Sequence, residues 1–199
     1  MGSILYAMKK EKKKLLLHVC CAPCSTHVIE SLMKEYALTI FFYNPNIFPR
    51  EEYARRLDTA CIVADYYGLI FVDAAYDTES FERAVAGHED DSEGGRRCEL
   101  CFNLRLQKTA QAAKMGGYDL FATTLTISPH KDSGKVNVCG SGAGKKFGIP
   151  FLEGDFKKHD GFKKSIELSK KLNLYRQRYC GCVYSSKENR PKPEGRASH

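Results

Sequence analysis

Seven of the nine cysteines in this chain of 199 residues fall into three tight clusters. The clusters are Cys20-Cys21-Ala22-Pro23-Cys24, Cys98-Glu99-Leu100-Cys101 and Cys180-Gly181-Cys182. Two thiols in such a pair can bind one metal, because the intervening turn brings both sulfur atoms to the same side. The clusters lie far apart along the chain, so the fold must bring them together if they form one centre. Seven thiols exceed the set that a lone structural zinc ion uses, which favours a metal or iron–sulfur centre.

The composition is that of an ordinary globular protein. Charged residues make up 28% and hydrophobic residues 43% of the chain, and no apolar run is long enough for a transmembrane helix. The N-terminus lacks the pattern of a signal peptide, so we expect a cytoplasmic protein with no membrane contact. In that compartment, clustered cysteines bind metals or act as redox thiols. The formal charge of +7 comes mostly from the two tails, so it is weak evidence for nucleic-acid binding.

Short β-rich runs alternate with segments of helical spacing over most of the chain. We expect one domain, residues 15–186, between a basic, flexible N-terminal segment, residues 1–14, and a disordered tail, residues 187–199. Its expected strands are residues 15–19, 38–43, 69–73, 120–123 and 150–153. Its expected helices cover residues 28–36, 50–67, 77–86 and 163–172, one that starts near the second cysteine cluster and ends at 115, and one that ends near 148. This alternation predicts a parallel sheet of about five strands with helices on both faces.

Polar and sulfur-bearing residues follow several of the expected strands. The first cysteine cluster, Asn44, Thr123-Thr124 and Asp155 each come directly after one. Parallel sheets bind ligands beyond the carboxyl ends of their strands, so we expect these residues to converge on one rim. A carboxylate at this rim could bind iron or transfer protons, but from its position alone Asp155 is more typical of a helix cap or a salt bridge.

The spacing of the cysteines also fits two simpler kinds of site. Cys98, Cys101, Cys180 and Cys182 match a zinc site that would pin the C-terminal segment. The pair Cys21 and Cys24 lies between a strand and a helix, which is also typical of a thioredoxin-like redox pair. Such a pair needs no second and third thiol cluster. The two remaining thiols, Cys61 and Cys139, lie among apolar residues and are expected in the core.

Several segments together resemble the QueH-type epoxyqueuosine reductases, the cobalamin-independent enzymes of the last step of queuosine synthesis in tRNA. They are residues 18–24, 43–47, 95–106, 123–125, 154–158 and 174–182. The resemblance covers about residues 15–185. It implies a HUP-like, Rossmann-like fold whose cysteine-rich C-terminal segment closes the site, a [4Fe-4S] cluster, and an adjacent mononuclear metal, iron. It also implies reductive removal of the epoxide oxygen from epoxyqueuosine at the wobble position of tRNA.

The resemblance leads to a hypothesis for each site residue. The [4Fe-4S] ligands would be Cys98, Cys101, Cys180 and Cys182. The adjacent metal would be bound by Cys20, Cys21, Cys24 and Asp155, and Asp155 would also take part in catalysis. A partition that mixes the first and second clusters remains open.

The implied partners are tRNA and an electron donor of unknown identity, such as a ferredoxin or a flavodoxin. Basic and aromatic residues near the C-terminus are candidates for tRNA contacts, although each could equally belong to a solvated face. The candidates are Lys157, Lys158, Lys163, Lys164, Tyr175, Arg176 and Arg178. The alternatives are a metal-free thiol–disulfide oxidoreductase and a zinc-stabilised tRNA-binding protein. ATP use is disfavoured, because cysteines occupy the place of a pyrophosphate-binding loop after the first strand.

Overall fold

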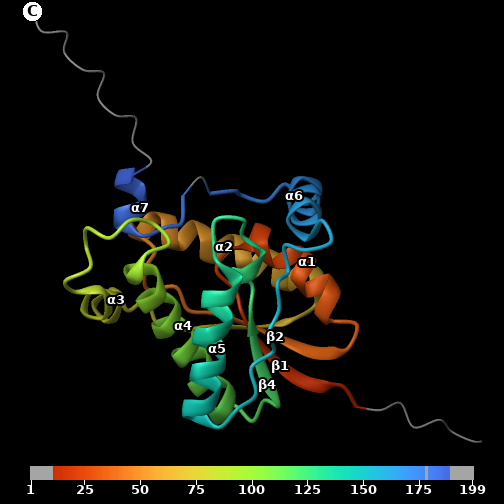
Figure 1. Cartoon of the computed structure of the whole chain (residues 1–199). Coiled ribbons are helices and arrows are strands. Elements are labelled where there is room, and N and C mark those ends of the chain that lie inside the picture. The colour runs from red at the N-terminus through yellow and green to blue at the C-terminus, as the bar shows by residue number, and fades with distance from the viewer. Residues whose placement is uncertain (1–10, 178, 189–199) are drawn as a thin grey trace, which may run out of the picture.

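The computed structural model describes residues 11–177 and 179–188, so the expectations for residues 1–10 and 189–199 lie outside it. Helices and strands alternate along the chain (Figure 1). In order they are β1 (Lys13–His18), α1 (Ala22–Leu32), β2 (Tyr36–Phe42), α2 (Arg50–Tyr67), β3 (Ile70–Asp73), α3 (Thr78–Val85), α4 (Arg96–Met115), β4 (Leu120–Thr123), the short 3-10 helix η1 (Leu125–Ile127), α5 (Ser133–Phe147), α6 (Gly161–Lys171) and α7 (Val183–Glu188). In the described part of the chain, no helix combines the length and apolar character needed to cross a bilayer.

The strands form one parallel sheet in the order β3-β2-β1-β4. The parallel α/β architecture is confirmed, but the sheet has four strands rather than the five expected. The segment expected as the fifth strand, residues 150–153, forms a single bridge between Phe151 and Phe121 beside β4. Pro150 lacks the N–H that would extend the pairing toward the preceding residues.

The central strand β1 separates two apolar layers. Its Leu15 and Leu17 pack against residues of α1 and α2, whereas Leu16 packs against α4 and α5. Successive side chains of a strand point to opposite faces, so a strand covered on both faces must be apolar throughout. Burying each of these leucines contributes about 1.5 to 3 kcal/mol, which makes β1 the best-anchored strand of the sheet. Figure 1 shows the two helical layers on either side of the strands.

Some boundaries differ from those expected. α1 begins at Ala22, directly after the first cysteines, because Pro23 is suited to the first turn of a helix. It ends at Leu32, and Tyr36 already belongs to β2. β1 begins at Lys13, inside the segment expected to be flexible, because Lys13 pairs in register with Tyr36. The short helix α7 has no counterpart among the expected elements.

Helix α5 approaches the bridge segment so closely that side chains are excluded from one of its faces. A Cβ atom at Gly140 would lie 2.4 Å from the ring of Phe151, and one at Gly144 would lie 2.7 Å from the carbonyl oxygen of Ile149. The two glycines are one helical turn apart and therefore share this face. The contact holds α5, and with it the loop before it, against the edge of the sheet.

The close approach leads to a test of stability. We expect Gly144→Ala to lower the free energy of unfolding by about 1 to 3 kcal/mol, because the backbone at Ile149 would have to move. The matched control is Gly142→Ala on the same helix, where a Cβ atom meets nothing within 4 Å. That change should raise stability by about 0.5 to 1 kcal/mol through helix propensity alone. Urea unfolding of both variants measures this, and equal effects would contradict the packing argument.

Candidate metal centre

A cavity of about 290 Å³ lies beyond the carboxyl ends of the strands. The loops after β1, β2 and η1, the helices α2, α4 and α6, and the C-terminal segment all contribute to its wall. The backbone N–H of Cys20 donates to Thr124 Oγ1 at 3.3 Å, and Asn44 Nδ2 donates to the Val19 carbonyl at 2.9 Å. The expected convergence of these three loops is therefore confirmed.

The first cysteine cluster is a compact trio of thiols at this cavity. The Sγ atoms of Cys20, Cys21 and Cys24 all lie within 4.8 Å of one another. The Sγ atoms of Cys20 and Cys21 are 3.7 Å apart. Cys21 is the N-cap of α1, and Cys24 lies in its first turn. The positive end of the helix dipole therefore favours negative charge on these sulfur atoms. The Gln177 amide donates a further hydrogen bond to Cys21 Sγ at 2.8 Å.

The pKa values of the three thiols are shifted in different directions. Hydrogen bonds from the thiols of Cys21 and Cys24 lower the pKa of Cys20 well below its usual value, despite burial. The same hydrogen bond to Cys20 raises the pKa of Cys21 to about 12. Hydrogen bonding to Cys20 and then to Cys21 raises the pKa of Cys24 as well. Cys20 is therefore the thiol of the trio that ionises most readily, with the other two thiols as its hydrogen-bond donors.

The second and third clusters lie close to each other. Cys98 and Cys101 occupy the first two turns of α4 on one face, and Cys101 packs in a small buried group with Cys182. Burial, with a smaller contribution from negative charge on Cys180, raises the pKa of Cys101 to about 12. Burial likewise raises the pKa of Cys98, and charge on Cys180 and Cys182 adds to that rise. These four thiols are thus near enough to influence one another electrostatically.

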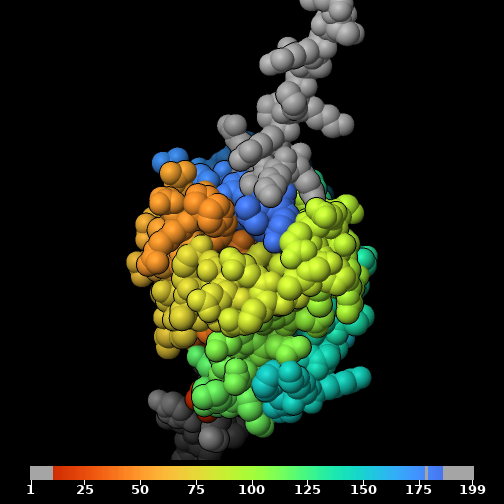
Figure 2. Space-filling view, turned by 90° about the vertical axis from the view of Figure 1, so that its left-hand side faces the viewer, coloured from red at the N-terminus to blue at the C-terminus, as the bar shows by residue number. Residues whose placement is uncertain are grey.

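The C-terminal strap, residues 174–182 without the undescribed residue 178, is held onto α2 by a buried ion pair. Arg56 Nε donates to Glu52 Oε1 at 2.7 Å, and both side chains are almost fully buried. The same guanidinium donates to the carbonyl of Cys180 at 2.9 Å and to that of Tyr179 at 3.2 Å. Figure 2 shows the C-terminal segment, in blue, seated between orange α2 and the yellow-green segment before α4.

Gly181 allows the strap to make this contact. Its φ of 116° is a conformation that other residues rarely adopt, and a Cβ atom there would lie 2.9 Å from Arg56 Nη1. The carbonyl of Gly181 also accepts from the Phe48 N–H at 2.8 Å. Cys180 consequently lines the cavity together with the first trio, whereas Cys182 turns toward Cys101. The strap connects the first cluster with the second.

Two cations at the cavity had no role in the sequence interpretation. Arg105 is fully buried on α4, and Lys131 lies half-buried in the loop before α5. Desolvation lowers the pKa of Lys131, but negative charge on Cys180, Cys20 and Cys24 outweighs it and raises that pKa above its usual value. The one sequence signal for Arg105 is its spacing of four residues from Cys101, which places both on one face of a helix.

The histidines act as expected for hydrogen-bonding or surface residues. His18 is fully buried, and its Nε2 donates to the Tyr43 carbonyl at 3.2 Å. Its Nδ1 therefore accepts from the Thr123 hydroxyl at 2.8 Å. Burial, followed by the charge of Arg105, lowers the pKa of His18 to about 3, so the ring stays neutral. His159 is exposed.

Asp155 is not brought to the trio. Its Oδ1 lies 3.3 Å from Lys157 Nζ, which also donates to the Lys131 carbonyl and to Ser133 Oγ. Neither Asp155 nor Lys157 is among the described residues that line the cavity. This position agrees with a salt bridge as the role of Asp155.

The candidates for tRNA contacts lie in different environments. Lys158, Lys163, Lys164 and Arg176 are exposed. Tyr175 is half-buried, and its hydroxyl donates to Glu52 Oε2 at 2.8 Å. Arg178 lies outside the described residues.

The remaining cysteines lie outside these clusters. Cys139 is buried in the layer formed with α4 and α5, so its expected core position is confirmed. Cys61 is half-buried on α2 and belongs to none of the described core clusters, so the core expectation for it was wrong.

Solved structures share this fold at low sequence identity. The U34-tRNA thiolase NcsA from Methanococcus maripaludis, solved with its [4Fe-4S] cluster, matches 88% of this chain and 62% of its own with a TM-score of 0.55 and 14% identity. A predicted subunit of a tRNA methyltransferase from Methanocaldococcus jannaschii matches 78% of this chain and 74% of its own with a TM-score of 0.52 and 16% identity. These likenesses show the Rossmann-like, HUP-like fold.

Sequence relatives are much closer. An epoxyqueuosine reductase QueH from Streptococcus pyogenes serotype M1 is 43% identical over 182 residues, covering 88% of this chain and 71% of the relative. One from Thermotoga maritima is 38% identical over 181 residues, covering 89% of this chain and 93% of the relative. The family model described as "Epoxyqueuosine reductase QueH" matches residues 15–188. The chain therefore belongs to the QueH family of epoxyqueuosine reductases, which are oxidoreductases.

Proposed function

We propose that this protein reduces epoxyqueuosine in tRNA to queuosine, using a [4Fe-4S] cluster and an adjacent metal, iron, held by its three cysteine clusters. The observation that carries the proposal is the meeting of four thiols from two distant segments, Cys20, Cys21, Cys24 and Cys180, on the wall of one cavity. The strap that carries Cys180 also brings Cys182 into contact with the second cluster at Cys101. Membership of the QueH family supports the reduction of epoxyqueuosine, and the thiols on the cavity wall support the use of a metal centre.

The residues present fit an anionic, sulfur-bound centre. Soft thiolates are the ligands of iron–sulfur clusters, and the wall of the cavity carries thiols from the first cysteine cluster and from the strap. Arg105 is buried there with an Nε that has no hydrogen-bond partner, and Lys131 faces the same thiols. Buried cations of this kind need nearby negative charge. Thiolates around a metal centre would provide it.

We assign Cys98, Cys101, Cys180 and Cys182 to the cluster and the trio Cys20, Cys21 and Cys24 to the adjacent metal. The mutual influence of the first four thiols and the separate compactness of the trio support this partition. Cys180 lies between the two groups, so a partition that exchanges it with a thiol of the trio is the main alternative. Asp155 would have to exchange its ion pair with Lys157 before it could act as a fourth ligand of the adjacent metal or in catalysis.

Removal of the epoxide oxygen as water takes two electrons and two protons and leaves an alkene. An iron–sulfur cluster supplies electrons one at a time, and an adjacent metal supplies a Lewis acid for the epoxide oxygen. The protein encloses the reacting group: Phe162 at the start of α6 and Tyr179 of the strap are the aromatic residues on the described cavity wall. Aromatic side chains of this kind stack on bases that leave a single-stranded loop. Lys131 would stabilise negative charge beside the thiols.

The substrate and the electron donor approach from outside the cavity. The exposed residues Lys158, Lys163, Lys164 and Arg176 would contact phosphates of the anticodon arm, with Arg178 and Tyr175 as further candidates. Lys157 is the weakest candidate, because its ammonium is engaged with Asp155 and the loop before α5. A one-electron carrier such as a ferredoxin or a flavodoxin would serve as donor. A cytoplasmic location follows from the tRNA substrate as part of the proposal.

Anaerobic reconstitution with iron and sulfide tests the proposal directly. The loaded protein should show broad visible absorption, contain the iron of a [4Fe-4S] cluster plus one further ion, and convert epoxyqueuosine-containing tRNA to queuosine with a chemical reductant. Cys182→Ala should abolish the visible absorption, whereas Cys21→Ala should lose only the additional iron. Cys61→Ala, outside the clusters, is the matched control. Bound zinc without iron would favour a zinc-stabilised tRNA-binding protein instead.

The different pKa shifts in the trio predict thiol reactivity in the metal-free protein. Since hydrogen bonds lower the pKa of Cys20 and raise those of Cys21 and Cys24, iodoacetamide should modify Cys20 faster than the other two at about pH 7. Its rate should rise less between about pH 6 and pH 9 than that of a thiol whose pKa is raised. The rate at Cys61, whose pKa burial raises, should climb steadily over the same range. Mass spectrometry of the modified peptides measures both rates. Faster modification of Cys24 would contradict the assignment, and iron loading should protect the whole trio.

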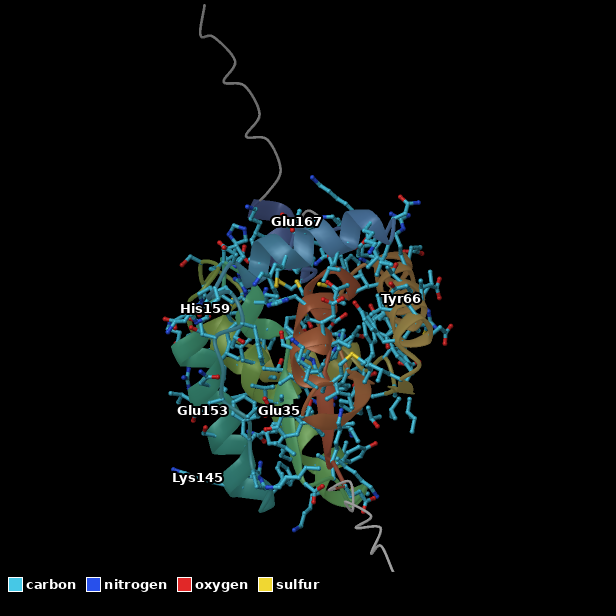
Figure 3. All side chains as sticks on the ribbon, turned by 90° about the vertical axis from the view of Figure 1, so that its right-hand side faces the viewer. Glu35, Tyr66, Lys145, Glu153, His159 and Glu167 are labelled. Carbon is cyan, nitrogen blue, oxygen red and sulfur yellow. The ribbon has the colours of Figure 1, made fainter. Side chains whose placement is uncertain are left out.

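The tRNA contacts predict a change in salt dependence. The double variant Lys158→Gln, Lys163→Gln should bind tRNA more weakly, with the slope of log affinity against log salt smaller by about 1 for each lost contact. Iron content should stay normal. The control is Lys145→Gln, which lies at the opposite end of the molecule from Glu167 on α6 (Figure 3). An unchanged slope in the double variant would remove these lysines from the interface.

A further inference from the structure

Arg105 is the largest side chain that is completely buried in the described molecule. It lies in the middle of α4, four residues after Cys101, and reaches the wall of the cavity. Arginine is rarely buried to this extent unless a carboxylate pairs with it. A guanidinium buried to this extent lowers the stability of the protein unless negative charge lies nearby.

The hydrogen bonds of Arg105 leave its charge uncompensated. Nη2 donates to Asn44 Oδ1 at 2.5 Å, and Nη1 donates to Cys101 Sγ at 3.9 Å. Nε is buried and has no hydrogen-bond partner. Within residues 11–177 and 179–188, no carboxylate forms an ion pair with this guanidinium.

Another buried arginine, Arg56, does have a carboxylate partner in this fold. Arg56 is equally inaccessible, but Glu52 lies 2.7 Å from its Nε. A neutral amide and a thiol cannot replace that carboxylate, because neither carries the opposite charge. An unpaired buried charge is among the more costly features a protein can retain. The partner of Arg105 must therefore come from the sulfur atoms around it.

Arg105 acts on two of the three cysteine clusters. Hydrogen bonds from neighbouring thiols lower the pKa of Cys20, and the charge of Arg105 lowers it further. Burial raises the pKa of Cys101, and the charge of Arg105 opposes that rise. Arg105 lines the cavity together with the trio, and its Nη1 donates to Cys101 Sγ at 3.9 Å, so the guanidinium lies near both groups of thiols. The negative charge of a sulfur-bound centre would concentrate there.

We propose that Arg105 is the internal counter-ion of the metal centre, a positioning residue whose charge offsets that of the thiolates and raises the reduction potential of the cluster. The inference rests on the proposed function. Each added electron increases the negative charge of the cluster, so a fixed cation nearby favours the reduced form. The same cation, without that negative charge, destabilises the metal-free protein.

The test compares Arg105→Met with Arg105→Lys in metal-free and iron-loaded protein. Methionine removes the charge but keeps a long side chain, whereas lysine keeps the charge but not the planar donor geometry. Arg83→Met, at an exposed ion pair on α3, is the matched control. Three quantities are measured for each protein: the thermal unfolding midpoint without metal, the iron retained against a chelator, and the potential at which the visible absorption bleaches.

We expect metal-free Arg105→Met to be at least as stable as the parent protein, because it no longer buries an unpaired charge. Once loaded, it should retain less iron, and its equilibrium constant for one-electron reduction should fall at least tenfold, about 59 mV. Arg105→Lys should recover most of the potential. If Arg105→Met cannot hold the cluster, retention by Arg105→Lys together with undiminished metal-free stability supports the inference equally.

Four results would overturn the inference. An unchanged potential and iron content in Arg105→Met would show that the charge does not act on the centre, while the proposed function would stand. Equal losses of stability in the metal-free and loaded forms would indicate a packing role through Asn44. Loss of the cluster in both Arg105 variants would indicate a need for the guanidinium geometry rather than for charge. A parent protein that binds no iron would overturn the inference and the proposed function together.

Discussion

The site depends on one buried ion pair, Arg56 with Glu52, which holds the C-terminal strap against α2. Hydrogen bonds from Arg56 to the carbonyls of Tyr179 and Cys180 help to fix Cys180 beside the trio. The pair also connects to the strap through the Tyr175 hydroxyl, which donates to Glu52. Breaking a buried pair of this kind costs about 3 to 5 kcal/mol, because the remaining charge stays buried. The last thiols of the chain are therefore positioned by electrostatics rather than by a strand of the sheet.

Charge balance organises the cavity as much as sulfur does. Four cysteines on the cavity wall supply potential negative charge, and Arg105 and Lys131 supply positive charge. In the described structure, neither of these two cations forms an ion pair with a carboxylate. Hydrogen bonds from Cys21 and Cys24 lower the pKa of Cys20, so the trio itself favours negative charge on that sulfur atom. This arrangement would suit the anionic iron–sulfur centre that we propose. The charge of Arg105 also adds to the effect of burial, which lowers the pKa of His18 and keeps its ring neutral.

Much of the fold could be predicted from the sequence, because local signals were strong. The helix Arg50–Tyr67 and the strand Leu120–Thr123 agree with expectation at both ends. Gly68 adopts the left-handed conformation that ends the helix, and the strand is a continuous apolar run. The prediction of a fifth strand at residues 150–153 was wrong, because strand pairing at a sheet edge depends on how the neighbouring helix packs. Helix α7 was missed because its polar sequence is stabilised by tertiary contacts, such as Tyr184 stacking on Arg97.

The sequence by itself determined the grouping of the thiols, the alternation of strands and helices, and membership of the QueH family. These follow from residue type and spacing, which are local properties of the chain. Only the tertiary structure decided that Asp155 pairs with Lys157 outside the cavity and that Arg105 lies inside it without a carboxylate. Burial and charge pairing depend on which distant segments cover a side chain. That information lies in the packing of the strap, the loops and α4 around the sheet edge, not in any one stretch of residues.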